Sequence, residues 1–220
     1  MPQLMFPQAL FRAFEDDFMP NNQLMEHHFT QEYNPKSSLW GGETVCGEGS
    51  VLDNNLSFIE WLGRKTQELG IESIIDVGCG DMNYMKHFLN RFEGLRYCGV
   101  DISKPLIESN SETYSLLDFQ HLNICDSTPV GHHQLCIVKE VFIHISKEQV
   151  LNAISNIRKI DGLEYLLVSG HIEGFSIIES GDEYGHFAYH FQGLENYELV
   201  DSFVDNEVRM FRLYSLRPNA

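Results

Sequence analysis

The stretch from Ile74 to Met85 constrains the fold more than any other part of the sequence. An apolar run ends at Val77, glycines follow at positions 78 and 80, and a helical pattern begins soon afterwards. This order predicts a strand, a tight turn and a helix. Because glycine lacks a Cβ atom, Gly78 and Gly80 let a ligand approach the backbone amides closely. The N-terminal end of the following helix then favours a carboxylate or a phosphate.

A second apolar run, which starts at Tyr97, ends in an acid at Asp101. A carboxylate at the tip of the second parallel strand of a doubly wound fold accepts hydrogen bonds from a ribose diol. The turn lacks the third glycine that dinucleotide enzymes usually show. An α/β fold that binds no nucleotide is the alternative.

The pattern D-x-G-x-G with a following acid resembles the first two motifs of class I S-adenosylmethionine (SAM) methyltransferases. The resemblance implies that SAM is the cofactor and S-adenosylhomocysteine (SAH) the product. It places six residues of this part of the chain in the SAM site: Asp76, Gly78, Cys79, Gly80, Asp101 and Ile102.

A glycine-rich segment over residues 39–50 precedes the first strand. Four glycines within nine positions predict a loop that turns sharply or touches another group. The segment is similar to the W-G-G-G-E-S-x-S-G-x-G-S stretch before D-x-x-C-G-D-F-N-W-M in a family of small bacterial and viral SAM methyltransferases. The similarity runs from about Phe29 to Ser146. It implies that Trp40, Gly41 and Gly42 close over the methionine end of SAM; a purely structural loop is the alternative.

The end of the third predicted strand is expected to contact the adenine. In related enzymes an acid and the next backbone amide hold this base, and the acid position falls on Asn123, followed by Ile124. The side-chain carbonyl of asparagine still accepts one hydrogen bond from the adenine amine. Asp126 is the rival, and we favour Asn123 with Ile124.

The segment after the fourth predicted strand is expected to face the methyl group, because ligands gather at the carboxyl ends of parallel strands. The family carries R-D-V-L-V-H-L-S here, which adds Lys139 and Glu140 to the SAM-binding residues. A hydroxyl nucleophile needs a base, and His144, with a reference pKa near ~6.5, is suited to that role. Glu140 would orient His144 or hold a substrate hydroxyl. His171 is the second candidate base, and simple packing of His144 at a helix start is the alternative.

The polar and aromatic segment 172–192 contains a possible metal site. His186 and His190 are four residues apart, which on a helix could bind a metal with Asp182 or Glu183. A loop rich in aromatics and acids is also ordinary in a carbohydrate-binding cleft. We consider a divalent metal possible but do not favour it, and assign no metal ligands.

The whole pattern predicts a Rossmann-like α/β fold with helices on both faces of the sheet. By analogy with class I methyltransferases, we expect a seven-stranded, mostly parallel sheet in the order 3-2-1-4-5-7-6 with an antiparallel last strand. Residues 1–50 would form an N-terminal arm or helical cap with the glycine-rich loop, and 51–220 the methyltransferase domain. Phe11, Phe14 and Phe18 share a helical face in the arm, which packs in the core or serves as a lid. The predicted strands are 71–77, 96–101, 118–124, 134–140, 163–169, 197–204 and 208–216, and the predicted helices include 55–70, 82–91 and one that begins after Ser103.

Charge and composition limit the partners. The 220 residues carry 32 acidic and 15 basic side chains, a net charge of −17, which disfavours nucleic acid. Without a membrane-spanning apolar run or a basic leader, we expect no membrane partner and a cytoplasmic location, in the host cell if the protein is viral. Five cysteines without C-x-x-C spacing indicate neither a disulfide scaffold nor a zinc site.

These features predict a SAM-dependent O-methyltransferase that acts on a hydroxyl of a sugar or glycan. The histidine base, the acidic and aromatic late segment, the charge and the similarity to viral enzymes, some of which decorate capsid glycans, favour this acceptor. A small metabolite or a protein amine or carboxylate is the enzymatic alternative, although Lys139–Phe142 does not match the Asn/Asp-Pro-Pro-Tyr motif of many amine methyltransferases. A SAM-binding module without catalysis is the other alternative. The oligomeric state is not specified.

Overall fold

The computed structural model describes residues 21–32, 42–172, 191–205 and 209–217. Its centre is a seven-stranded sheet in the order β3-β2-β1-β4-β5-β7-β6. Strands β1 to β5 run parallel, and β7 pairs antiparallel with both β5 and β6, so the predicted fold is confirmed. The strands are β1 (Ser73–Val77), β2 (Arg96–Asp101), β3 (Asp118–His121), β4 (Leu135–Val138), β5 (Tyr165–His171), β6 (Glu198–Asp205) and β7 (Arg209–Ser215).

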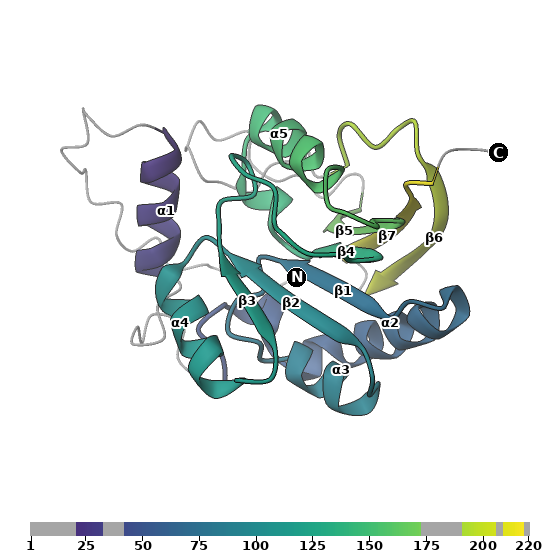
Figure 1. The fold of residues 1–220 in the computed structure, drawn as a ribbon, viewed down its shortest axis with the longest axis horizontal. Coiled ribbons are helices and arrows are strands. Elements are labelled where there is room, and N and C mark those ends of the chain that lie inside the picture. Colours follow the sequence, from purple (N-terminus) through teal and green to yellow (C-terminus); the bar gives the residue numbers. More distant parts are fainter. Residues whose placement is uncertain (1–20, 33–41, 173–190, 206–208, 218–220) are drawn as a thin grey trace, which may run out of the picture.

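Helices cover both faces of this sheet, as predicted. Figure 1 shows α2 and α3 on one side and α5 on the other, with α1 beyond one end of the strands. The described helices are α1 (Asn21–Glu32), α2 (Leu56–Leu69), α3 (Met85–Arg91), α4 (Lys104–Thr113) and α5 (Lys147–Ile157), with short 3₁₀ turns η1 (Glu48–Ser50), η2 (Asp53–Asn55) and η3 (Phe142–His144). Among them, none is both long enough and apolar enough to cross a membrane.

Local sequence explains where several helices begin and end. Gly70 closes α2 in a left-handed conformation (φ 64°), as expected for a C-terminal glycine cap. Ser146 and Gln149 form a capping box at the start of α5, each bonding the backbone of the other. Ser103 precedes α4 as predicted, but its side chain makes no capping hydrogen bond.

Several predicted boundaries were wrong, and three have a clear backbone cause. Met82 was predicted to open a helix, but its φ of 63° is left-handed, and α3 begins only at Met85. Glu140 has a φ of 56°, so β4 ends at Val138 and not at residue 140. β3 ends at His121 because the chain turns at Asn123, whose carbonyl oxygen accepts from the amide of Asp126.

The strand pairing extends β5 further than expected. It runs to His171 because it pairs with β7 along its whole length, from Tyr165 opposite Ser215 to His171 opposite Arg209. The predicted turn at Asp205-Asn206 joins β6 to β7, but residues 206–208 lie outside the described part of the chain, as does the predicted helical face of Phe11, Phe14 and Phe18.

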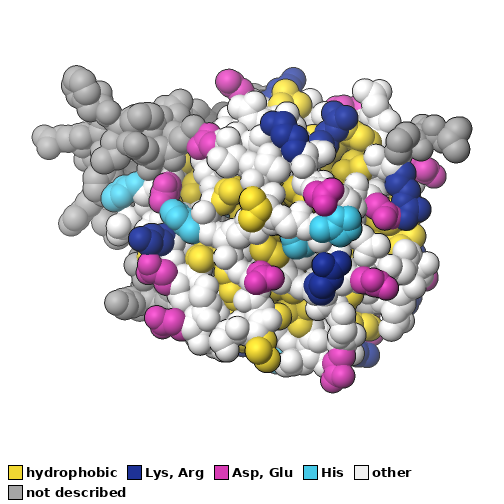
Figure 2. All heavy atoms as spheres, in the orientation of Figure 1, with side chains coloured by type: hydrophobic (Ala, Val, Ile, Leu, Met, Phe, Trp, Pro, Cys, Tyr) yellow, Lys and Arg dark blue, Asp and Glu magenta, His cyan; other side chains and the backbone are white. Residues whose placement is uncertain are grey.

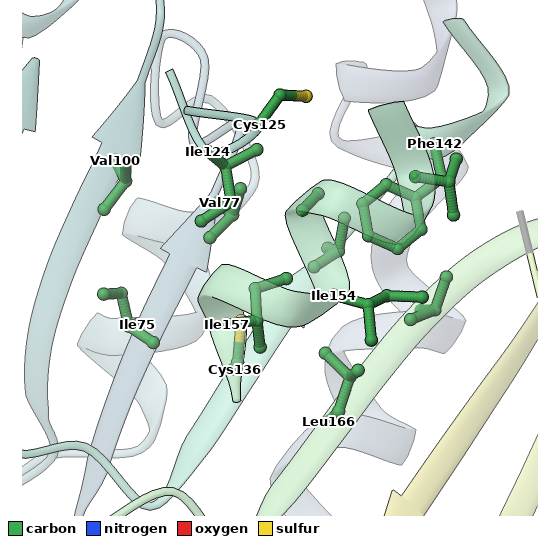
Figure 3. Packing of buried hydrophobic residues seen from close by; sticks show 14 of the residues in the cluster. Ile75, Val77, Val100, Ile124, Cys125, Cys136, Phe142, Ile154, Ile157 and Leu166 are labelled. Atoms are coloured by element: carbon green, nitrogen blue, oxygen red, sulfur yellow. The ribbon is translucent and has the colours of Figure 1, made fainter. Parts of the chain in front are cut away.

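The core lies on both faces of the sheet and fixes its carboxyl edge in place. In Figure 3, Ile75 and Val77 of β1 pack toward Ile154 and Ile157 of α5. The opposite face is filled by aromatic and aliphatic side chains around α2, with Phe58 stacked on Phe211 of β7 at 4.3 Å between ring centroids.

Acidic and basic side chains are interspersed on the face that Figure 2 shows. All five cysteines are free thiols, and those at positions 79, 98, 125 and 136 are buried, where they act as small apolar side chains.

Candidate active site

A cavity opens at the carboxyl ends of β1, β2 and β4, the edge where open α/β sheets bind ligands. It contains about 970 Å³ of empty space, including the part that is open to solvent. Its walls come from α1, the glycine-rich loop, the glycine turn and the segments that follow β2, β3 and β4.

The glycine turn forms the floor of the cavity. Gly78 and Gly80 both have positive φ angles, 77° and 57°. A Cβ atom at position 78 would lie 2.2 Å from the side chain of Val141, and one at position 80 would lie 2.8 Å from Sγ of Cys46. Glycine is therefore required at both positions by the backbone angle and by the close packing of the cavity wall.

Asp101 joins the glycine turn to the start of α4. Its Oδ2 accepts a hydrogen bond from the amide of Gly80 (3.0 Å), and its Oδ1 accepts one from the amide of Ser103 (2.8 Å). Burial raises the pKa of Asp101, and the hydrogen bonds from Ser103 and Gly80 oppose that shift. Each carboxylate oxygen retains an acceptor position, and the residue lines the cavity, as a ribose-binding acid requires.

The glycine-rich loop and the glycine turn are joined by hydrogen bonds. Oδ2 of Asp81 accepts hydrogen bonds from Thr44 Oγ1 (2.7 Å) and from the amide of Val45 (2.8 Å). Asn83 Nδ2 donates to Oε1 of Glu43 at 2.7 Å. The glycine-rich loop is thus docked on the glycine turn.

Sequence reasoning missed this role of Asp81 and Asn83. Both belong to the quoted motif of the glycine turn, so the available signal was the polar pair within that motif. The part of the glycine-rich loop that reaches the cavity also differs from expectation. Gly42 is exposed and is not among the lining residues, whereas Cys46 and Ser50 are. Trp40 and Gly41 lie outside the described residues.

Asn123 and its rival Asp126 contact each other. Asn123 Nδ2 donates to Asp126 Oδ2 at 2.8 Å, and Asn123 Oδ1 accepts from the amide of Cys125 at 2.9 Å. Asn123 and Ile124 line the cavity, whereas Asp126 is exposed and is not part of the lining. The amide oxygen of Asn123 can accept a second hydrogen bond, so contact with a base remains chemically available.

Asp76 lies beneath the cavity floor and does not line it. The side chain is 1% exposed; Oδ2 accepts from the hydroxyl of Tyr97 (2.9 Å), and Oδ1 has no hydrogen-bond partner among the described residues. Burial raises the pKa of Asp76 to about 7, against the opposing effects of the Tyr97 hydrogen bond and the Lys139 charge. Its predicted contact with SAM would therefore be indirect.

This shift predicts a pH-dependent effect of Asp76→Asn on stability. The raised folded-state pKa means that the stabilising contribution of Asp76 is complete below about pH 4 and is lost as pH rises through about 7. The asparagine variant has no such loss. The melting temperature of the variant minus that of the wild type should therefore increase by several degrees between about pH 4 and pH 8. Thermal unfolding without ligand would test this. A difference between the proteins that is constant across pH would contradict it.

Lys139 and Glu140 line the cavity after β4. The Glu140 carboxylate lies 3.6 Å from Lys139 Nζ and 3.2 Å from Nη1 of Arg209. Burial alone would raise the pKa of Glu140, but the charges of Lys139 and Arg209 outweigh it and lower this pKa to about 2. Glu140 is therefore ionised at neutral pH and is suited to accept hydrogen bonds rather than a proton.

His144 lies in η3 on the cavity wall, half-buried, directly before the cap of α5. Its ring meets that of Phe29 of α1 edge to face, with centroids 6.2 Å apart. The structure thus places His144 both at a helix start and in the cavity. His171 ends β5, and its side chain is not described.

The predicted metal-binding residues Asp182, Glu183, His186 and His190 lie outside the described residues. Within the described ranges, no three His, Cys, Asp or Glu side chains are grouped to hold a metal ion.

Comparison with known proteins agrees with this geometry. Residues 75–166 match the model of a protein family described as a methyltransferase domain. Comparison with curated proteins gives no match.

Solved structures share the fold at low sequence identity. Magnesium protoporphyrin IX methyltransferase from Synechocystis PCC 6803, solved with bound SAH, is 12% identical with a TM-score of 0.62, covering 88% of this chain and 98% of that one. Coclaurine N-methyltransferase, bound to N-methylheliamine and SAH, is 13% identical with a TM-score of 0.57, covering 89% and 86%. The N-methyltransferase NodS from Bradyrhizobium japonicum WM9 is 13% identical with a TM-score of 0.53, covering 74% and 98%.

The strand order and the cavity at its carboxyl edge define a Rossmann-like fold of the class I methyltransferase type. The matched segment, which contains the glycine turn, Asp101 and His144, carries the methyltransferase domain. The chain thus has the fold of SAM-dependent methyltransferases, and residues 75–166 match a methyltransferase domain.

Proposed function

We propose that this methyltransferase transfers a methyl group from SAM to a hydroxyl of a sugar or glycan. The observation that carries the proposal is the position of His144, on the wall of the same cavity that Asp101 and the glycine turn line. SAM, when bound, supplies an electrophilic methyl group on a sulfonium. The chain's own residues have to position the acceptor and take up its proton.

The described residues fit this cofactor. β1 pairs with β2 on one side and with β4 on the other, so Asp101 and Glu140 flank the glycine turn. Two strand spacings separate them, roughly 10 Å. We assign Asp101 to the ribose hydroxyls, Asn123 and Ile124 to the adenine, and Glu140 to the methionine end.

His144 is the proposed general base. An alcohol is a weak nucleophile at neutral pH, so a nearby nitrogen that takes its proton accelerates attack on the methyl group. Phe29 packs against the ring of His144, and Val141 and Ile145 line the same wall. These apolar neighbours would exclude water from His144. They would also favour a methyl-accepting substrate with an apolar face.

Two observations bear on the acceptor class. The chain carries 32 acidic and only 15 basic side chains, which disfavours polyanionic substrates and is compatible with a neutral sugar. Two of the similar structures are of N-methyltransferases, which supports the alternative of an amine acceptor on a small molecule.

A labelled-methyl assay decides between these classes. Purified protein with SAM is incubated with sugars, nucleotide sugars, small amines and carboxylates, and the products are identified by mass spectrometry. We expect a methyl ether on a sugar. Methylation of amines alone would replace the proposed acceptor class, and tight SAH binding without turnover on any acceptor would favour a non-catalytic module.

Helix α1 is proposed to form the acceptor side of the cavity. Met25 is 2% exposed and accepts a hydrogen bond at Sδ from Gln149 (3.5 Å), while Glu26 lies 3.1 Å from His121 at the end of β3. These contacts tie α1 to both sides of the cavity mouth and leave Phe29 beside His144. This arrangement supports the proposal that the N-terminal arm serves as a lid.

Phe29→Ala should therefore raise KM for the acceptor about 10- to 150-fold, because roughly 1.5–3 kcal/mol of apolar contact is removed. The Kd for SAH should change less than about twofold. Gln31→Ala, an exposed position on the same helix, is the matched control. Deletion of residues 1–35 should weaken selectivity and turnover further; unchanged selectivity and turnover in the deletion would refute the lid.

A further inference from the structure

Arg209 of β7 joins segments that are far apart in the sequence, although it does not line the cavity. The side chain is buried, at 7% exposure. Its Nη2 donates to Asp205 Oδ2 and to the carbonyl oxygen of Asn54, and its Nη1 donates to the carbonyl oxygen of Gly49 (3.4 Å) and to Glu140 Oε1 (3.2 Å). One guanidinium therefore ties the last strand pair to the glycine-rich loop and to the end of β4.

Glu140 is fixed by its surroundings. Its amide donates to Ser169 Oγ at 2.7 Å, and its left-handed backbone aims the side chain at the glycine-rich loop. A Cβ atom on Gly49 would lie only 1.7 Å from Glu140 Oε2, so only glycine leaves room for the carboxylate there.

The cations around Glu140 are more deeply buried than the carboxylate. Lys139 Nζ donates to the Gly49 carbonyl oxygen at 2.7 Å and lies 4.7 Å from the ring centre of Tyr84. The side chains of Lys139 and Arg209 are 3% and 9% exposed, whereas that of Glu140 is 26% exposed. Lys139 and Glu140 both line the cavity, but the carboxylate is the more exposed of the two, so a cationic group complements the exposed part of this cluster.

We propose that Arg209 is a positioning residue that holds the Glu140 carboxylate as the acceptor for the α-ammonium group of SAM. The proposal rests on the proposed function, because it assigns the amino-acid end of the cofactor to the β4 side of the glycine turn. A carboxylate oxygen accepts more than one hydrogen bond, so Glu140 can bind an ammonium group while its contacts to Arg209 and Lys139 persist.

The test compares two ligands by calorimetry. SAH carries the amino-acid group, and 5′-methylthioadenosine shares the nucleoside and the thioether but lacks it. Arg209→Met and Glu140→Gln should each weaken SAH binding about 10- to 100-fold, the loss of a charge-assisted hydrogen bond, and change the Kd for methylthioadenosine less than about twofold. Arg212→Met, on the same strand, should change neither.

Arg209→Lys provides a milder form of the test and remains informative if the methionine variant does not fold. Lysine keeps the charge but lacks the fork that reaches Gly49 and Glu140 together, so SAH affinity should fall to an intermediate value. Equal losses for both ligands, or no loss for either, would overturn the proposal. Failure of the wild-type protein to bind either ligand would instead overturn the proposed function.

Discussion

Replacing Asp101 with alanine is expected to weaken SAH binding at least ~100-fold. The variant loses the proposed acceptor for the two ribose hydroxyls, and each charge-assisted hydrogen bond contributes about 1.5–3 kcal/mol. It also removes the link that holds the amide of Gly80 to the carboxylate at 3.0 Å, so the glycine turn loses its anchor to α4. Isothermal titration calorimetry with SAH measures the effect directly.

Two further variants serve as controls for Asp101→Ala. Asp118→Ala removes an exposed acid at the opposite end of the sheet and should leave the Kd within about twofold. Asp101→Asn keeps the shape but loses the charge and one acceptor oxygen, so it should lie between alanine and wild type. If the alanine variant bound SAH as tightly as the wild type, the assignment of the whole cofactor site would be wrong.

Replacing His144 with alanine is expected to lower kcat by about 10²–10⁴ while the Kd for SAH stays within about twofold. The magnitude is that of losing the proposed general base, and the ring contacts Phe29 of α1 on the cavity wall. Single-turnover kinetics with labelled SAM separate the chemical step from binding.

The matched control for His144 is His132→Ala. His132 is a histidine at the other edge of the sheet, paired with Asp161 at 3.0 Å, and its loss should leave turnover unchanged. Added imidazole should restore part of the activity of His144→Ala by filling the vacated space. Parallel losses of turnover and SAH affinity, without rescue, would assign His144 a packing role only.

The sequence predicted the strands and the place of the cavity because these depend on local patterns, whereas the strand order followed from the resemblance to class I methyltransferases. Apolar runs such as Ile74–Val77 alternate with helical segments, and parallel strands direct their carboxyl ends to one edge, where Asp101 and the glycine turn meet. The boundaries at Met82 and Glu140 could not be predicted, because both are non-glycine residues with positive φ. The residue type at these positions does not indicate such a conformation.

The residues that organise the cavity were harder to find. Arg209 contacts the loop 160 residues earlier in the chain, and Asp81 contacts the loop 36 residues earlier. Contacts at such separations are set by the packing of the sheet and not by any local spacing. Phe29 reaches the cavity only because α1 folds back over the strand ends, which its sequence does not specify.

The docking of the glycine-rich loop on the glycine turn affects how ligands enter and leave the cavity. Since Thr44 and the amide of Val45 donate to Asp81, the loop cannot move away without breaking these two hydrogen bonds to the glycine turn. We expect helix α1 to be the wall that opens. Product escape should slow in viscous solvents, while the methyl-transfer step itself should not.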